Sequence, residues 1–413
     1  MRSIKKIQDV VDWGLCVGCG ACYALCDMGA VSLVNIVNIG VRPQFKIDLC
    51  ENCVECLSIC PGFSVDATLS APRTDEEYID NFLIGPTISI WEGFATDKEI
   101  RFRASSGGLL TALALYCLEK EGMELVLHTG AHPGKPWENK TRISKSKDEL
   151  LTNAGLRYVT SSPCDLFRVI EESSRPCVFI GKPCDTAAIT ALRKKRPKLD
   201  ENLGLVLTFC CAGVPSVLAS LDLMRKFNVN KEAVTHLSYR GDGWPGGFTI
   251  TSKDGVKKIL SNYTASWHFL QKYRSFRCHI CPDGLGELCD ISCGDAWHRY
   301  NEKTDNPGLS LAMVRTHRGQ ELLNRAVASG YLELTPSSPE SVIEAQGLIE
   351  RRKVVFGRQL AMKILTVPTT KFIGFRLFKT WSRTTPVVMV KSVLGTLRRL
   401  IQRSLWHRNK LIP

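Results

Sequence analysis

The sequence predicts an α+β chain in which a small cysteine-rich module is followed by an α/β body and a basic helical tail. Three observations predict this order. Two runs of four cysteines lie within residues 16–60, apolar strand patterns alternate with helical ones from about Thr87 onward, and no acidic residue follows Glu350. Alternation of strands and helices is typical of an α/β body with a parallel or mixed sheet.

The N-terminal cysteines have the spacing of a bacterial-type ferredoxin. The runs are Cys16-x2-Cys19-x2-Cys22-x3-Cys26 and Cys50-x2-Cys53-x2-Cys56-x3-Cys60, the second followed by Pro61. Three thiolates of one tight loop reach three irons of a [4Fe–4S] cube, and in two-cluster ferredoxins the fourth ligand comes from the other run. The spacing therefore predicts a bacterial-type ferredoxin fold with two [4Fe–4S] clusters and crossed ligands: Cys16, Cys19, Cys22 and Cys60 for one cluster, and Cys50, Cys53, Cys56 and Cys26 for the other.

Two other uses of these cysteines fit less well. Structural zinc sites favour two CxxC pairs around one ion, whereas this chain has two complete runs of four. A disulfide framework implies an exported protein, and residues 1–12 lack the apolar segment of a secretory signal. No stretch approaches the ~20 apolar residues of a membrane-spanning helix. We therefore expect a cytoplasmic protein.

The body is expected to begin near Thr87, after a polar linker over residues 68–84. A strand is predicted over residues 88–95 and a helix over residues 109–120. The turn Ser105-Ser106-Gly107-Gly108 precedes that helix. Such a turn offers backbone N–H groups and the positive helix end to an anion such as a flavin phosphate, and the two serines would add hydroxyl donors. A plain capped helix start explains the same residues.

A third group of cysteines lies later in the chain. Cys278 and Cys281 form a CxxC pair, which is half of a cluster site and could equally hold zinc or act as a redox dithiol. Cys184 ends a predicted strand and tight turn over residues 177–184, Cys211 follows a predicted strand at residues 203–209, and ligands in α/β sheets lie at such strand ends. Cys289 and Cys293 are the local competitors for the two remaining ligand positions. The remaining candidates are expected to be buried packing residues: Cys117, Cys164 and Cys177.

Several separated motifs resemble the beta subunits of coenzyme F420 hydrogenases and dehydrogenases. They are Ser105-Ser106-Gly107-Gly108, Gly181-Lys182-Pro183-Cys184-Asp185, Cys211-Ala212-Gly213-Val214-Pro215-Ser216 and Cys278-x2-Cys281-Pro282-Asp283. The resemblance implies FAD bound in the body at Ser105, Ser106, Gly107, Gly108 and Lys182. It also implies a third [4Fe–4S] cluster held by Cys184, Cys211, Cys278 and Cys281. The chain departs from the family at Asp185, where a residue such as glutamine is usual.

We therefore expect four regions: a ferredoxin domain at 1–71, the N-terminal and C-terminal parts of the family at 85–165 and 166–345, and a basic tail at 346–413. Hydride chemistry moves two electrons whereas each cluster accepts one, and a flavin can bridge the two. The predicted function is electron exchange between F420 or another small molecule and a one-electron partner protein. The alternative is a ferredoxin-type adapter without substrate chemistry. No side chain is assigned as an acid or base, because Lys182 and Asp295 are near the site by motif only.

The tail accounts for the net charge of +13. Residues 351–413 contain fifteen of the 54 Lys and Arg residues, so the rest of the chain is nearly neutral. Basic residues interleaved with Phe and Trp suit peripheral contact with an anionic membrane, here the inner face. A helix packed on the body or a site for an acidic partner explains the same pattern. Electron transfer gives nucleic-acid binding no evident purpose.

Overall fold

The computed structural model describes residues 3–50, 54–69, 78–304, 306–405 and 407–408. Within these residues, the centre is an eight-stranded mixed sheet in the order β16-β6-β15-β14-β10-β9-β7-β8. Its strands are β6 (Ser89–Ala95), β7 (Val126–His132), β8 (Lys135–Ser144), β9 (Cys177–Gly181), β10 (Leu203–Phe209), β14 (Ile291–Asp295), β15 (Ser310–Val314) and β16 (Leu332–Pro336). Strands β14, β10, β9 and β7 run parallel and the outer pairs are antiparallel. The prediction of a parallel or mixed sheet is confirmed.

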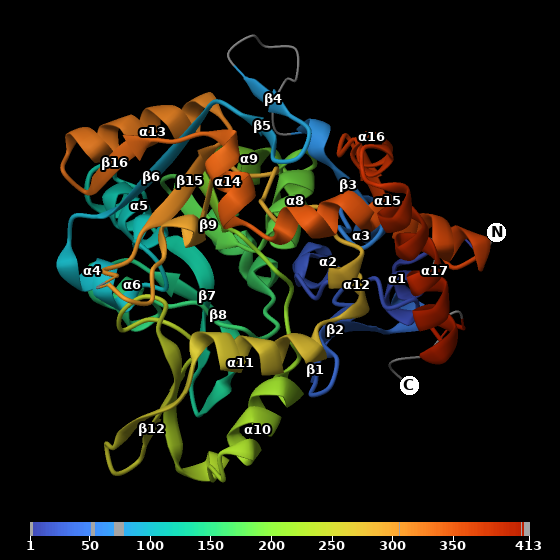
Figure 1. Cartoon of the computed structure of the whole chain (residues 1–413), viewed down its shortest axis with the longest axis horizontal. Helices are drawn as coiled ribbons and strands as arrows, with labels where there is room; N and C mark the ends of the chain where they lie inside the picture. Colours follow the sequence, from blue (N-terminus) through green and yellow to red (C-terminus); the bar gives the residue numbers. More distant parts are fainter. Residues whose placement is uncertain (1–2, 51–53, 70–77, 305, 406, 409–413) are drawn as a thin grey trace.

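Helices cover both faces of this sheet (Figure 1). Helices α5 (Leu109–Glu119) and α13 (His317–Ala328) pack on one face, and α7 (Arg168–Glu171), α8 (Pro183–Arg193) and α9 (Pro197–Asn202) pack on the other. Successive strand residues point to opposite faces, so Val178 of β9 joins the first apolar cluster and Phe179 joins the second. Strands buried on both faces have continuous apolar sequences, and for this reason β10 lies at its predicted bounds. Shorter helices of the body are α4 (Lys98–Arg103), α6 (Lys147–Thr152) and α14 (Pro339–Ala345).

The N-terminal module packs on the face of the sheet that carries α8. It contains α1 (Ile7–Asp12), α2 (Ala21–Leu25), β1 (Val31–Ile36), β2 (Gly40–Phe45), α3 (Glu55–Ser58) and β3 (Ser64–Asp66). Ile59 is buried in the same apolar cluster as Phe167 of the body. Strands β1 and β2 form an antiparallel hairpin with a turn at residues 37–39.

Two smaller sheets flank the body. A hairpin of β4 (Ile79–Asn81) and β5 (Gly85–Thr87) begins in the predicted linker and ends after it, and residues 70–77 of the linker lie outside the described residues. A three-stranded antiparallel sheet of β11 (Val234–Ser238), β12 (Gly247–Ser252) and β13 (Lys257–Asn262) lies with α10 (Val217–Lys226) and α11 (Tyr263–Leu270) at the bottom of Figure 1. Helix α12 (Phe276–His279) then leads back toward the body.

The basic tail packs against the N-terminal module. It folds as α15 (Leu348–Ile364), β17 (Lys371–Ile373), α16 (Leu377–Ser382) and α17 (Pro386–Gln402), and β17 pairs in parallel with β3. Met362 and Leu400 of the tail are buried with Val10 and Val11 of α1. The tail therefore forms part of the core of the N-terminal module. The basic composition of the tail did not indicate this role. Among the described residues, no helix combines the length and apolar character needed to cross a membrane.

Candidate functional site

Four cysteines predicted for the first cluster line one cavity, which we call the N-terminal cavity. Cys16 and Cys19 come from the loop after α1, Cys22 from the first turn of α2, and Cys60 from the second cysteine run. Gly18 in this loop has φ +75°, and an added Cβ would lie 2.7 Å from a carbonyl oxygen of β2. Glycine is therefore required where the loop crosses β2.

The thiols of the N-terminal cavity fit an iron–sulfur cluster by their chemistry. Burial raises the pKa of Cys22, and the neighbouring sulfurs raise it further. Burial likewise raises the pKa of Cys60. Thiolates so close together need a positive partner, and bound iron deprotonates its thiol ligands. No three His, Cys, Asp or Glu side chains among the described residues are placed to hold a single metal ion, and a cube spreads its ligands over four irons instead.

Three of the four cysteines predicted for the second cluster lie in the described part of the chain. Cys26, Cys50 and Cys56 are each half-buried, and Cys53 lies outside the described residues. The Cys56 sulfur is 3.7 Å from the Cys22 carbonyl oxygen and also borders the N-terminal cavity. The two cysteine runs are thus folded against each other, as crossed ligation requires.

A second cavity, the central cavity, brings together cysteines that are distant in sequence. It is lined by Cys184, Cys211, Cys278 and Cys281, the four predicted for the third cluster. Cys184 lies in the first turn of α8 directly after β9, and Cys211 follows β10. Because β9 and β10 are parallel neighbours, their carboxyl ends place these two residues on the same edge of the sheet. Helix α12 and the residues after it supply the CxxC pair.

The competing cysteines lie elsewhere. Cys289 and Cys293 are buried in the two apolar clusters on opposite faces of the main sheet, and the Cys289 thiol donates to the Gly286 carbonyl at 3.4 Å. Neither borders the central cavity. The cysteines expected to be packing residues are fully buried, which confirms that prediction: Cys117, Cys164 and Cys177.

Three arginines from separate parts of the chain also line the central cavity. They are Arg42 of β2, Arg277 of α12 and Arg351 of α15. Their guanidinium groups donate to backbone carbonyls at 2.6–3.4 Å. Each also has a buried Nε–H without a hydrogen-bond acceptor, and none forms an ion pair with a carboxylate of the described residues. No sequence pattern pointed to these residues, because the cavity forms only in the assembled fold.

The third cavity, the large cavity, has a volume of about 210 Å³ and includes the predicted flavin-binding turn. Ser105, Ser106 and Gly108 line it, directly before α5. Gly107 is not part of the lining, and its N–H donates to the Ser310 hydroxyl at 2.8 Å. Gly108 is the N-cap of α5 with φ +81° and provides no capping side chain, so the first N–H groups of the helix border the cavity.

The two serine hydroxyls of this turn are engaged within the protein. Ser106 donates to the Leu309 carbonyl at 2.8 Å and accepts from the Ser310 hydroxyl at 2.9 Å, whereas we predicted it as a hydroxyl donor to the ligand. The Ser105 oxygen accepts the Leu156 N–H and keeps its own proton. The turn is therefore held in place by its serines, and its backbone and the Ser105 hydroxyl proton are left to meet a ligand.

Two buried ion pairs flank the large cavity. Lys182 Nζ lies 2.6 Å from Asp185 Oδ2 and donates to the Ser161 hydroxyl at 2.8 Å. Burial lowers the pKa of Lys182, but the Asp185 carboxylate together with the Cys184 and Cys211 sulfurs outweighs burial and raises the pKa overall. Arg240 holds Asp295 by two hydrogen bonds of 2.9 and 2.7 Å. Lys182 and Asp295, to which the sequence assigned no acid or base role, thus both belong to the cavity wall.

Sequence reasoning missed Arg240. This residue is buried, donates to the Ser105 carbonyl, and faces the rings of Tyr263 and Trp297 at 4.6 and 5.1 Å from their centroids. It thereby ties the turn before α5 to the end of β14. The available signal was an arginine that directly precedes the glycine-rich loop at residues 241–246.

The three cavities adjoin one another in a row. The large and central cavities share Lys182 and Cys211, and the central and N-terminal cavities share Cys16 and Val17. A cysteine that we predict to be a cluster ligand, Cys211 or Cys16, thus lies between each cavity and the next. The arrangement can support stepwise electron transfer if each cavity holds a redox group.

Comparisons with known proteins agree with this geometry. Residues 90–167 and 175–340 match the family models for the N-terminal and C-terminal parts of the coenzyme F420 hydrogenase/dehydrogenase beta subunit, and residues 9–32 match a 4Fe-4S binding domain. The chain is 27% identical to the beta subunit of the coenzyme F420 hydrogenase of Methanothermobacter thermautotrophicus, over 65% of this chain and 91% of that one. It is 22% identical to a subunit of the F(420)H(2) dehydrogenase of Methanosarcina mazei, over 75% and 85% of the two chains.

A solved structure shares the fold. A chain of the F420-reducing [NiFe] hydrogenase complex from Methanosarcina barkeri aligns with a TM-score of 0.55 at 21% identity, covering 71% of this chain and 98% of that one. The two family models together match more than half of the sequence, which confirms the resemblance drawn from the motifs. The chain belongs to the family of coenzyme F420 hydrogenase/dehydrogenase beta subunits, which are oxidoreductase components, and it carries a 4Fe-4S binding domain in front of the family's body.

Proposed function

We propose that this chain is an iron–sulfur flavoprotein component that passes electrons between a small molecule and a one-electron partner protein. FAD would occupy the large cavity, one [4Fe–4S] cluster the central cavity, and two clusters the N-terminal module. The observation that carries this proposal is the sharing of wall residues: Cys211 borders the large and central cavities, and Cys16 borders the central and N-terminal cavities. Sites that adjoin in this way exchange electrons without a mobile carrier.

The large cavity offers the groups that a flavin dinucleotide requires. The positive end of α5, an eleven-residue helix, borders it at Gly108 and suits the pyrophosphate. The buried side chains of Lys182 and Arg240 lie in the same wall, each paired with a carboxylate that holds it in place. Bound FAD would supply two-electron chemistry toward the small molecule and one-electron chemistry toward the clusters. The residues of this chain would hold and orient it and exclude water.

The small molecule is proposed to be coenzyme F420. The relatives above are named for hydrogenase and dehydrogenase activity with F420, and they are subunits of larger enzymes. By the same reasoning the electrons enter or leave through a partner protein at the N-terminal module. Crossed ligation places Cys26, Cys50, Cys53 and Cys56 around the second cluster of that module.

Cofactor analysis separates this proposal from a ferredoxin-type adapter. Protein purified without oxygen should contain about one FAD per chain and about twelve iron and twelve sulfide atoms, the content of three cubes. Reduced F420 should then bleach the broad visible absorbance of the clusters, with dithionite as the control for their full reduction. Absence of FAD from protein with full iron content would favour the adapter. Presence of FAD without bleaching would exclude F420 and retain the flavoprotein.

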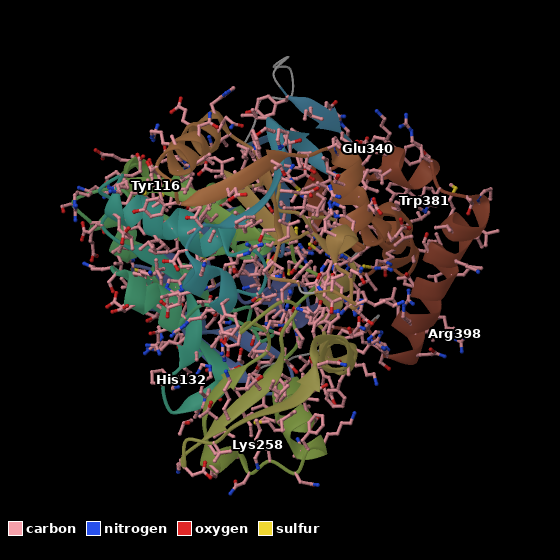
Figure 2. All side chains as sticks on the ribbon, turned by 60° about the vertical axis from the view of Figure 1, so that its left-hand side comes forward. Tyr116, His132, Lys258, Glu340, Trp381 and Arg398 are labelled. Atoms are coloured by element: carbon pink, nitrogen blue, oxygen red, sulfur yellow. The ribbon has the colours of Figure 1, made fainter. Side chains whose placement is uncertain are left out.

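We also propose that α17 touches an anionic membrane from the cytoplasmic side. The helix buries Leu400 but exposes Val387, Val390 and Leu394. The exposed Lys391 lies between Val390 and Leu394 in the sequence, and the exposed Arg398, labelled in Figure 2, follows one turn after Leu394. Exposed apolar side chains interleaved with lysine and arginine suit an anionic lipid surface, at about 1 kcal/mol per basic residue.

Vesicle sedimentation tests this contact. Vesicles with anionic lipids should retain the wild-type chain, and Leu394→Asp should reduce retention at least several-fold while leaving the fold intact. Equal sedimentation with anionic and with neutral vesicles would contradict the proposal.

A further inference from the structure

The walls of the central and N-terminal cavities differ in charge. Arg42, Lys182, Arg277 and Arg351 all line the central cavity, whose one acidic wall residue within the described chain is Asp283. The N-terminal cavity has apolar residues and glycines around its cysteines, and no lysine, arginine, aspartate or glutamate of the described residues lines it. Both cavities therefore contain cysteine sulfurs, but the wall of the central cavity is positively charged and the wall of the N-terminal cavity is uncharged.

Most of the positive charge around the central cavity is not neutralised by the protein. Lys182 is paired with Asp185, and Asp283 accepts the N–H groups of Gly286 and Glu287 at 2.8 and 3.1 Å. The three arginines have only carbonyl partners and retain buried Nε–H groups without acceptors, as described above. Arg42 and Arg277 are 3% and 2% exposed.

Buried guanidinium groups without a counter-charge are costly, because their hydration is lost and no anion replaces it. A cube with its four thiolates is an anion, and its sulfurs accept hydrogen bonds. Such a group would supply both the missing charge and the missing acceptors. The arginines therefore fit the group that the cysteines predict.

The charge difference acts on the reduction potential. Reduction adds one negative charge to a cluster, so nearby cations favour the reduced state, whereas an apolar wall without charges disfavours it. Arg42 also lies beside the N-terminal cavity, since a Cβ added to Gly18 of that wall would lie 3.4 Å from the Arg42 guanidinium. Arg277 and Arg351 border the central cavity but not the N-terminal cavity. The difference in charge between the two walls therefore comes from these two residues.

We propose that the cluster of the central cavity has a higher reduction potential than the cluster held by Cys16, Cys19, Cys22 and Cys60. Electrons then pass downhill from the N-terminal module into the body, toward the large cavity. This deepens the proposed function and rests on it. The chain is built to receive single electrons from a low-potential partner at the N-terminal module and to reduce the small molecule.

Potentiometric titration followed by electron paramagnetic resonance tests this order in the anaerobically purified full chain. Cys278→Ser and Cys16→Ser assign the signals, because each removes or alters the spectrum of its own cluster. In the wild type the signal sensitive to Cys278→Ser should appear first as the potential is lowered. Arg351→Gln should make reduction of that cluster about tenfold less favourable, which is a downward shift of about 59 mV for one electron.

Matched variants separate charge from structure. Arg351→Lys keeps the charge and should restore most of the wild-type potential. Lys363→Gln removes the same charge from an exposed position about 18 Å along the same helix and should change neither cluster. Earlier reduction of the cluster sensitive to Cys16→Ser, or an unchanged potential in Arg351→Gln, would overturn the inference. An iron content that Cys278→Ser leaves unchanged would instead refute the third cluster, and with it this inference.

Discussion

The N-terminal cavity and the central cavity gather cysteines for the same purpose by two different routes. Residues 7–60 supply the whole wall of the first cavity. The wall of the second comes from the loop of Cys16 and Val17, β2, Thr160, the ends of β9 and β10, α12 and α15. A cavity made from one stretch depends on the spacing of its cysteines. A cavity made from many separate segments exists only when the module, the sheet and the tail are assembled, and its charges can come from any of them.

Cysteine substitutions should have the largest effects, because each should remove the cluster of one cavity and leave the other. Cys278→Ser should remove about four of about twelve iron atoms and leave the N-terminal clusters in place, because it disturbs one ligand set. Cys60→Ser should remove the first cluster and leave the central one. Iron analysis together with the visible spectrum measures both effects.

Cys289→Ala is the matched control, since Cys289 is buried outside the central cavity. It should retain the full iron content. If Cys289→Ala loses four irons while Cys278→Ser does not, the ligand set proposed for the central cavity is wrong.

Substitutions in the contact between the tail and α1 should have the next largest effect, on the stability of the fold. Leu400 is completely buried among Val10, Val11 and Met362, so Leu400→Ala should lower the free energy of unfolding by about 2–5 kcal/mol. Leu394 on the same helix is 59% exposed, and Leu394→Ala should change the free energy of unfolding by less than about 0.5 kcal/mol. Anaerobic thermal unfolding followed by circular dichroism measures the difference. Equal melting temperatures for the two variants would show that the tail is not part of the module's core.

The comparison of the two cavities also shows what could be predicted from the sequence. The cysteine runs could be interpreted because three ligands of a ferredoxin cluster come from one short loop. Strand β10 could be predicted because a strand buried on both faces has a continuous apolar sequence. Cys184 and Cys211 could be placed at strand ends, but the residues alone left Cys289 and Cys293 as competitors. Only the resemblance to a family favoured one set.

The walls of the cavities were harder to predict. Arg351 lies far along the chain from the other residues of the central cavity, and its sequence neighbours Arg352 and Lys353 are equally basic. Arg352 instead pairs with the buried Glu287, and Lys353 pairs with Glu350. Composition described this segment as a charged appendage, because contacts made through tertiary structure leave no periodic signal.

The approach of the N-terminal module to the body can be tested at Gly20. This glycine has φ +86°, and an added Cβ would lie 2.9 Å from the Cβ of Asp165 in the body. Gly29 in the same module also has positive φ, at +61°, but an added Cβ there would meet nothing within 4 Å. Gly29→Ala should therefore cost only the backbone strain, about 1–2 kcal/mol.

Gly20→Ala should cost clearly more than Gly29→Ala, because the module must also move away from the body. Thermal unfolding compares the two variants. In Gly20→Ala the iron of the N-terminal module should also be lost earlier than in Gly29→Ala on exposure to a chelator. Equal stability of the two variants would mean that the module does not rest tightly on the body at this point.

The smallest expected effect concerns the charge of Asp165 at that same contact. Burial raises the pKa of this carboxyl to about 6, although the Thr141 hydroxyl donates to it at 2.6 Å. Its value in the unfolded chain is about 3.9, so the folded protein binds the proton more tightly. Stability is therefore highest when Asp165 is protonated and falls as the pH rises from about 4 to about 6. Asp165→Asn keeps the acceptor for Thr141 and removes the charge.

At pH 8 the Asp165→Asn variant should be more stable than the wild type by about 1–2 kcal/mol. The difference should shrink toward pH 5, where the wild-type carboxyl is protonated in the folded state. Melting temperatures over this pH range measure it, with Glu172→Gln at an exposed position as the control that should change little. A difference that stays constant with pH would mean that the variant acts through packing. A difference that follows the titration would mean that the module docks on the body against a buried charge, and that the contact between them tightens in mild acid.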